Sequence, residues 1–106
     1  MCSSIMEMDW LEPWTATAGT DSQRLHQELQ LELTTGNLLH DIPLEVIGRS
    51  LANDDILVKL EHPDYEFAVV HLTWQREKSP EWPRAKFYLD SNDFVENKMK
   101  IDNYDY

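Results

Sequence analysis

The sequence is poor in cysteine and glycine, and each shortage excludes a class of site. Cys2 is the only cysteine among 106 residues, which excludes an intramolecular disulfide and any zinc site built from two or four cysteines. The three glycines, Gly19, Gly36 and Gly48, stand alone and do not form the glycine-rich loop that holds phosphates in common nucleotide-dependent enzymes. We therefore expect no cofactor, and the single cysteine fits a reducing compartment.

Basic residues and long apolar runs are also scarce. Nine Lys and Arg oppose 20 Asp and Glu, a formal net charge of −11, whereas affinity for nucleic acids comes largely from Lys and Arg that neutralise phosphates. No run of about 20 apolar residues is present to span a membrane, and residues 1–8 do not resemble a signal peptide. The sequence predicts a cytoplasmic protein with no nucleic-acid or membrane partner, and it leaves the oligomeric state open.

The residues that are present predict one folded domain. Hydrophobic residues make up 42 % of the chain, and a chain of this size removes roughly two-thirds of its surface from water on folding. Residues 1–20 lack periodicity, so we expect a poorly structured lead-in, followed by a single domain over 21–100 and a tail over 101–106. Within the lead-in, Trp10 and Trp14 are expected to pack onto the domain, because exposed indole rings are unfavourable in water.

The pattern of apolar residues predicts two helices and four strands. Leu25, Leu29 and Leu33 repeat every four residues, which is typical of an amphipathic helix starting near Ser22 with Asp21 as its cap. A second helix is expected over 91–99. Strand-length runs of β-branched and aromatic residues cover 44–50, 56–61, 67–74 and 85–89. Because the connections are too short for crossover helices, the fold class is α+β: a two-layer sandwich of a four-stranded antiparallel meander with both helices on one face.

Alternation along the strands separates a core face from a polar face. The core face is expected to contain Ile56, Val58, Leu60, Ala68, Val70, Leu72, Trp74, Phe87 and Leu89, packed against the helix leucines and Phe94. The opposite face is expected to carry Arg49, Lys59, Glu61, Phe67, Val69, His71, Thr73, Lys86 and Tyr88. Cations among aromatic rings can form a site for an anionic group or a partner peptide. The alternative is a solvated face on which Arg49 and Lys59 pair with Glu45 and Glu61.

Two tryptophans flank the long polar loop that follows the third predicted strand. Trp74 and Trp82 either stabilise the hairpin by stacking or line a groove together with His71 and Arg84. With Arg49 and Lys59, these residues are the candidate binding residues: His71, Trp74, Trp82, Arg84, Arg49 and Lys59.

Three strings in this region carry a resemblance to other proteins. They are NDDILVKL, then AVVHLTW, then WP with an aromatic residue a few positions later and an acidic-capped short helix. Together they span about residues 36–97 and resemble a family of small uncharacterised bacterial proteins that have no established activity. The resemblance implies a stand-alone cytoplasmic domain and implies nothing about catalysis.

No arrangement of side chains predicts a catalytic or metal site. The four histidines lack metal-ligand spacing, and Asn53, Asp54 and Asp55 lack the glycine and distal glutamate of a calcium loop. No serine lies in a nucleophile elbow. These absences favour a noncatalytic protein, although they leave open whether it is an enzyme.

Two main hypotheses about function follow. The first is a noncatalytic protein-interaction module, such as an immunity or inhibitor protein that neutralises a basic partner. Its acidic surface would be formed by Glu28, Glu32, Asp54, Asp55 and Asp64. The alternative is a ligand-binding or enzymatic domain, with His71 as acid or base and Arg49, Lys59 or Arg84 holding an anion. Whether His71 and Arg84 line one pocket discriminates between the two. A third hypothesis is self-association through the tryptophans of the lead-in or an unpaired edge strand.

Overall fold

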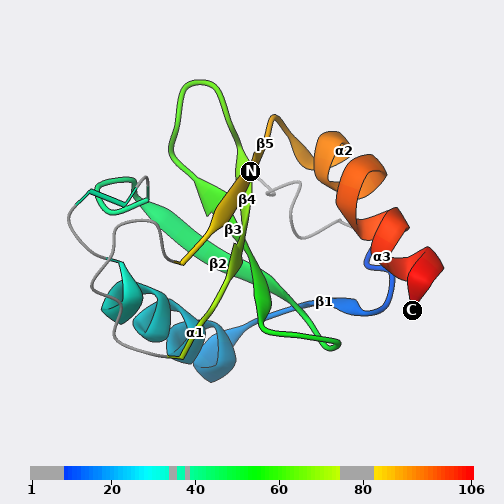
Figure 1. Ribbon diagram of the computed structural model, residues 1–106, viewed down its shortest axis with the longest axis horizontal. Helices are drawn as coiled ribbons and strands as arrows, with labels where there is room; N and C mark the ends of the chain where they lie inside the picture. Colours follow the sequence, from blue (N-terminus) through cyan, green and yellow to red (C-terminus); the bar gives the residue numbers. More distant parts are fainter. Residues whose placement is uncertain (1–8, 34–35, 38, 75–82) are drawn as a thin grey trace.

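Each strand of the sheet pairs with the next strand along the chain, and short polar turns join the three central strands. The computed structural model describes residues 9–33, 36–37, 39–74 and 83–106, and its sheet is antiparallel throughout, in the order β1-β2-β3-β4-β5 (Figure 1). The strands are β1 (Trp14–Ala16), β2 (Leu44–Ser50), β3 (Asp55–Leu60), β4 (Phe67–His71) and β5 (Ala85–Tyr88). The α+β class and the antiparallel meander are confirmed, with five strands instead of four.

The additional strand, β1, comes from the segment expected to be poorly structured. Trp14 and Ala16 pair with Ser50 and Gly48 of β2. Trp14 is buried, as expected, and the ring of Trp10 lies over Gly48, where a Cβ atom would clash with it. A strand of three residues is too short to show alternation, which is why the pattern did not reveal it.

The first helix, α1 (Gly19–Glu32), starts earlier than predicted. Its N-cap is Ala18, which makes no side-chain cap hydrogen bond, so Asp21 is not the cap. Asp21 instead lies in the first turn, where its carboxylate pairs with Arg24 at 3.1 Å. The apolar stripe is confirmed, since Leu25 and Leu29 are buried.

The C-terminal helix begins at Ser91 as predicted but runs longer. It consists of α2 (Ser91–Phe94), a π-helical segment η2 (Val95–Met99) and α3 (Lys100–Asp105). Asp90 caps it by accepting a hydrogen bond from the backbone N–H of Asp93 at 2.8 Å. The expected tail over 101–106 is therefore mostly helix.

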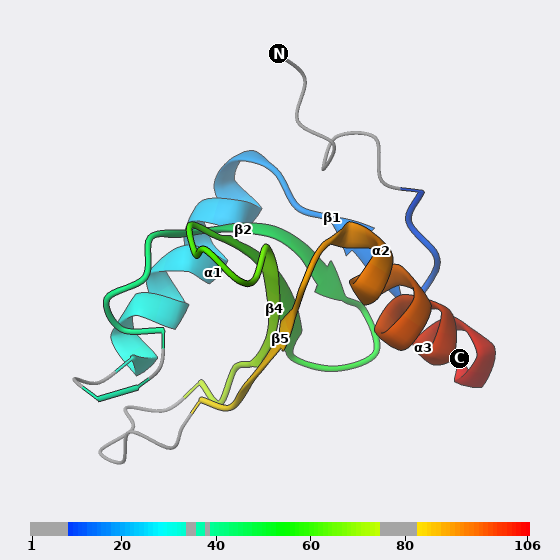
Figure 2. The same cartoon turned by 90° about the horizontal axis from the view of Figure 1, so that it is seen from above.

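The two helices cover opposite faces of the sheet, so the prediction that both lie on one face is wrong (Figure 2). Leucines of α1 pack with Ile56 and Val58, whereas Phe94 and Met99 of the C-terminal helix pack with Leu57, Phe67 and Val69. The ring of Trp14 contacts that of Phe94 edge-on, with centroids 5.2 Å apart. Phe67 and Val69 are apolar side chains on the face expected to be polar, and the C-terminal helix is what removes them from water.

The predicted core face is confirmed in the middle of the strands and fails beyond their ends. Ala68, Val70 and Leu72 are buried on the α1 side. Trp74 is 44 % exposed and Leu89 is 62 % exposed, because β4 ends at His71 and β5 ends at Tyr88. Trp74 also adopts φ of 60°, a left-handed conformation that interrupts the alternation of an extended strand.

Candidate functional site

The register of three neighbouring segments brings polar side chains into one row. Asp55 of β3 is the direct cross-strand partner of His71 of β4. The backbone N–H of His71 donates to the carbonyl oxygen of Arg84 at 3.1 Å, just before β5 begins. In the next row Val69 pairs with Lys86. Residues opposite each other in a sheet point to the same face, so these side chains share the face covered by the C-terminal helix.

A groove of about 390 Å³ lies between these two rows and the C-terminal helix. The sheet supplies one wall, and η2 and α3 supply the other, with η2 contributing Asn97 and Lys98. π-helical turns occur frequently at functional sites. The lining residues are Asp55, Val69, His71, Arg84, Ala85, Lys86, Tyr88, Asn97, Lys98, Ile101 and Asp102.

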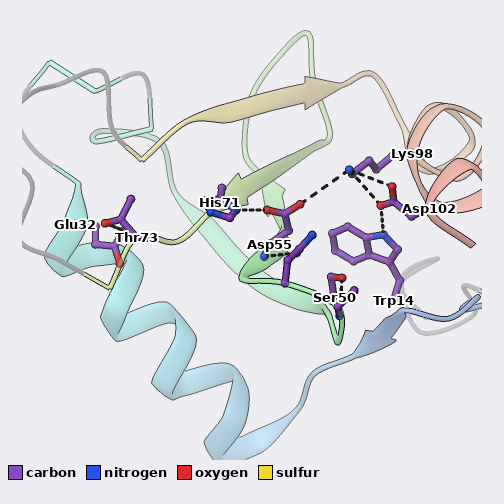
Figure 3. A network of polar contacts seen from close by, with 10 residues as sticks. Trp14, Glu32, Ser50, Asp55, His71, Thr73, Lys98 and Asp102 are labelled. Carbon is purple, nitrogen blue, oxygen red and sulfur yellow. Dashed lines mark hydrogen bonds and ion pairs between the residues drawn. The ribbon is translucent and has the colours of Figure 1, made fainter. Parts of the chain in front are cut away.

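A chain of polar contacts crosses the groove (Figure 3). His71 Nδ1 lies 2.7 Å from Asp55 Oδ1. Lys98 Nζ lies 3.9 Å from Asp55 Oδ2 and 3.2 Å from Asp102 Oδ2. The indole N–H of Trp14 donates to the same Asp102 oxygen at 2.7 Å. Both carboxylates of the groove are therefore engaged with partners of the same chain.

The His71 ring is held at one nitrogen and accessible at the other end. The Asp55 side chain is 13 % exposed, whereas that of His71 is 52 % exposed. A carboxylate at Nδ1 fixes the orientation of the imidazole and favours a proton on that nitrogen. Among the described residues, Nε2 has no hydrogen-bond partner, so it is available to a ligand in the groove.

Tyr88 contributes a neutral phenol to the groove. Burial, together with the negative charges of Asp102, Asp93 and Asp55, raises the pKa of Tyr88 to about 12. The phenol therefore stays protonated at neutral pH. The ammonium of Lys86 lies 5.6 Å from the centroid of the Tyr88 ring, a distance at which the cation is attracted to the ring face.

The groove is basic although the protein is acidic. Lys98 lies between the carboxylates of Asp55 and Asp102 and compensates part of their charge. Arg84 and Lys86 are exposed on the sheet wall. With Lys98, these two side chains give the described lining three cations against the two carboxylates of Asp55 and Asp102.

Only part of the predicted binding set meets in this groove. His71 and Arg84 line it together. Lys59 faces a separate hollow beside Glu45 and pairs with Glu66 at 3.2 Å. Trp74 does not line the groove, and Trp82 lies outside the described residues.

Arg49 lies on the opposite face of the sheet from the one predicted. Its guanidinium is 3.6 Å from the Asp21 carboxylate of α1, so the expected pair with Glu45 is not formed. The cause is a bulge in β2: Val46 pairs with Val58, but Gly48 pairs with Leu57. The extra residue reverses the alternation for everything after it.

The five predicted acidic residues do not form one surface. Glu32 is fully buried, so its assignment to a partner surface is wrong. Its carboxylate accepts hydrogen bonds from the backbone N–H groups of Thr73 and Trp74, each at 2.8 Å, and from the Thr73 hydroxyl at 2.9 Å. Asp55 belongs to the groove.

The other three acidic residues are dispersed. Asp54 and Asp64 are exposed in turns before and after β3, hence at opposite ends of that strand, and Glu28 is half-buried on α1. The structure does not gather them into a single patch.

Eight lining residues were not predicted as site residues, and the second wall consists of four of them, namely Asn97, Lys98, Ile101 and Asp102. They belong to the C-terminal helix, which was assigned to the wrong face of the sheet. The spacing of Lys98 and Asp102, four residues apart, was a usable signal for a helix continuing past Met99.

Comparisons of the chain with protein-family models, with curated proteins and with solved structures give no match. Within the described ranges, no three His, Cys, Asp or Glu side chains are grouped to hold a metal ion. Over the same residues, no helix has the length and apolar character needed to cross a membrane.

Proposed function

We propose that the protein is a noncatalytic binding domain whose groove receives an anionic group, a carboxylate or a phosphate, of its ligand. The observation that supports this most is the placement of His71, Arg84 and Lys86 in two adjacent rows of one groove wall. In a chain with only nine Lys and Arg, such a concentration of positive charge is selective for anions.

Each of the three groups has a distinct part in recognition. The guanidinium of Arg84 can donate two parallel hydrogen bonds to a carboxylate or phosphate. Lys86 adds a point charge one row further along the strand. The imidazole of His71 is held at Nδ1 by Asp55 and presents Nε2 to the groove.

The composition of the groove supports binding without catalysis. The described residues of its lining include no Ser, Thr or Cys to act as a nucleophile. The two carboxylates of the described lining are held by Lys98 and other donors of the same chain, so neither of them is positioned as a separate general base.

Titration with acetate and with inorganic phosphate, followed by NMR, tests this proposal. We expect saturable shifts of the His71 imidazole signals and of the side-chain signals of Arg84 and Lys86. Arg24 and Lys100 are exposed and lie outside the groove, paired with Asp21 and Glu96, so they serve as internal controls. Equal shifts at the control residues would show nonspecific ion binding and would refute the groove as a binding site.

A further inference from the structure

The groove lies beside an unpaired edge of the sheet. β5 is the last strand in the sheet order, and no described strand pairs with its outer edge. The carbonyl of Arg84 faces β4, where it accepts the His71 N–H. Backbone groups alternate in direction along an antiparallel strand, so those of Ala85 and Phe87 point outward. Within the described part of the chain, these outward backbone groups of Ala85 and Phe87 have no hydrogen-bond partner.

The charges on this strand have the spacing of an extended peptide. Arg84 and Lys86 are two residues apart and point to the same face of the sheet. In a neighbouring strand, side chains at positions i and i+2 also point to one face. Two carboxylates at that spacing would lie opposite the two cations.

We propose that the ligand is an acidic segment of a partner protein that adds to the outer edge of β5 as an extended strand. Its backbone hydrogen-bonds to Ala85 and Phe87, and its carboxylates at i and i+2 pair with Arg84 and Lys86. Addition of a strand to a sheet edge is a recurrent mode of peptide recognition, in which the backbone provides affinity and alternate side chains provide specificity. This inference rests on the proposed anion-binding function of the groove.

Charge complementarity favours an acidic peptide over a second copy of this chain. In antiparallel pairing of β5 with β5 of another copy, Lys86 would face Arg84 when Ala85 pairs with Ala85, or a second Lys86 when Ala85 pairs with Phe87. Like charges on neighbouring strands are destabilising. Cations on an edge strand are also a common device against self-pairing. An acidic strand turns the same residues into attractive contacts.

Labelled nine-residue peptides test the proposal by fluorescence anisotropy. The first peptide carries two glutamates at i and i+2 on a Thr and Val background, and the second has the same composition with the glutamates at i and i+1, on opposite faces. A third is the first peptide with N-methyl groups on the backbone amides that face β5. We expect the first peptide to bind at least about tenfold more tightly than either of the others. The second peptide loses one of the two charge pairs, and the third loses the backbone hydrogen bonds to β5.

The outcomes separate this inference from the function on which it rests. Equal affinities for the three peptides, with acetate and phosphate still shifting the groove signals, would overturn strand addition and leave anion binding standing. If neither anions nor peptides perturb the groove, both proposals fail. A dimer that forms through β5 in light scattering and is not dissociated by the first peptide would overturn the inference in favour of self-pairing.

A pair of double variants ties peptide binding to the two cations. The Arg84→Gln, Lys86→Gln protein should lose at least about tenfold in affinity for the first peptide, whereas Arg24→Gln, Lys100→Gln, which makes the same change in net charge, should keep it within about twofold. All four side chains are exposed, so both variants are expected to fold. Equal losses in the two variants would contradict the proposal.

Discussion

Asp55 and His71 are direct partners on neighbouring strands, and their side chains meet with Oδ1 and Nδ1 2.7 Å apart. The carboxylate is largely covered and the imidazole is half exposed. Asp55 therefore orients the His71 ring in the groove, and the ring itself stays accessible and outside the core. The relationship links the sheet register directly to the proposed binding site.

His71→Gln should separate binding from stability. Because half of the His71 side chain is in water, the free energy of unfolding should change by less than about 1 kcal/mol. The affinity for phosphate should fall about threefold or more, since the imidazole contact at Nε2 is lost. Urea unfolding and NMR titration measure the two effects. A loss of stability with unchanged affinity would show that the pair with Asp55 is structural only.

Glu32→Ala should be strongly destabilising. The substitution removes the buried acceptor of two backbone N–H groups and a hydroxyl, and each donor left unsatisfied away from water costs about 1–3 kcal/mol. We expect a total loss of about 2–5 kcal/mol in urea unfolding. Glu61→Ala, at an exposed position, is the matched control and should have little effect. Similar unfolding midpoints for the two variants would contradict the role assigned to Glu32.

Trp14→Phe tests the contact between β1 and the C-terminal helix. The variant keeps an aromatic ring against Phe94 but removes the indole N–H that donates to Asp102. We expect a loss of about 1–3 kcal/mol, because the hydrogen bond involves a charged acceptor and the smaller ring leaves a gap. Trp74→Phe, at a side chain that is 44 % exposed, provides the comparison. Equal stabilities would argue that β1 contributes little to the fold.

Tyr88 predicts how stability responds to alkaline pH. Its pKa is raised from 10.0 to about 12 in the folded protein, so the folded state holds the phenol proton more tightly than the unfolded state. This contribution to stability is complete below about pH 10 and is lost as the pH rises toward about 12. Tyr88→Phe should remove that part of the pH dependence.

Ultraviolet titration of the phenols checks the same assignment. The difference between the titrations of the native protein and Tyr88→Phe isolates the Tyr88 phenol, which should ionise at about pH 12. Ionisation of this phenol at its ordinary pKa of 10.0 in the folded protein would contradict the environment described for Tyr88.

Much of the sheet could be predicted because its central strands are long enough to show their pattern. Ile56, Val58, Ala68 and Val70 alternate with residues of the other face, and the short turns between strands leave few pairings. His71 and Lys86 were placed on the correct face by the same alternation. The pattern failed at Arg49, since one extra residue in β2 reverses the faces and leaves no clear mark in the sequence.

The groove could not be assembled from local patterns, because its second wall depends on which face the C-terminal helix covers. Phe67 and Val69 indicate which face the helix covers. They are two apolar residues on a face expected to be polar, so they require a cover, and Phe94 and Met99 supply it. Because both faces of β4 are buried, the helix and its Lys98 lie on the same side of the sheet as His71.

The most direct test of the central claim is the phosphate affinity of two charge-matched double variants, measured by NMR titration at one salt concentration. The account predicts that Arg84→Gln, Lys86→Gln lowers the affinity about tenfold or more, while Arg24→Gln, Lys100→Gln changes it less than about twofold. Equal affinities in the two variants would contradict the account, because anion binding would then follow the net charge of the protein and not the groove.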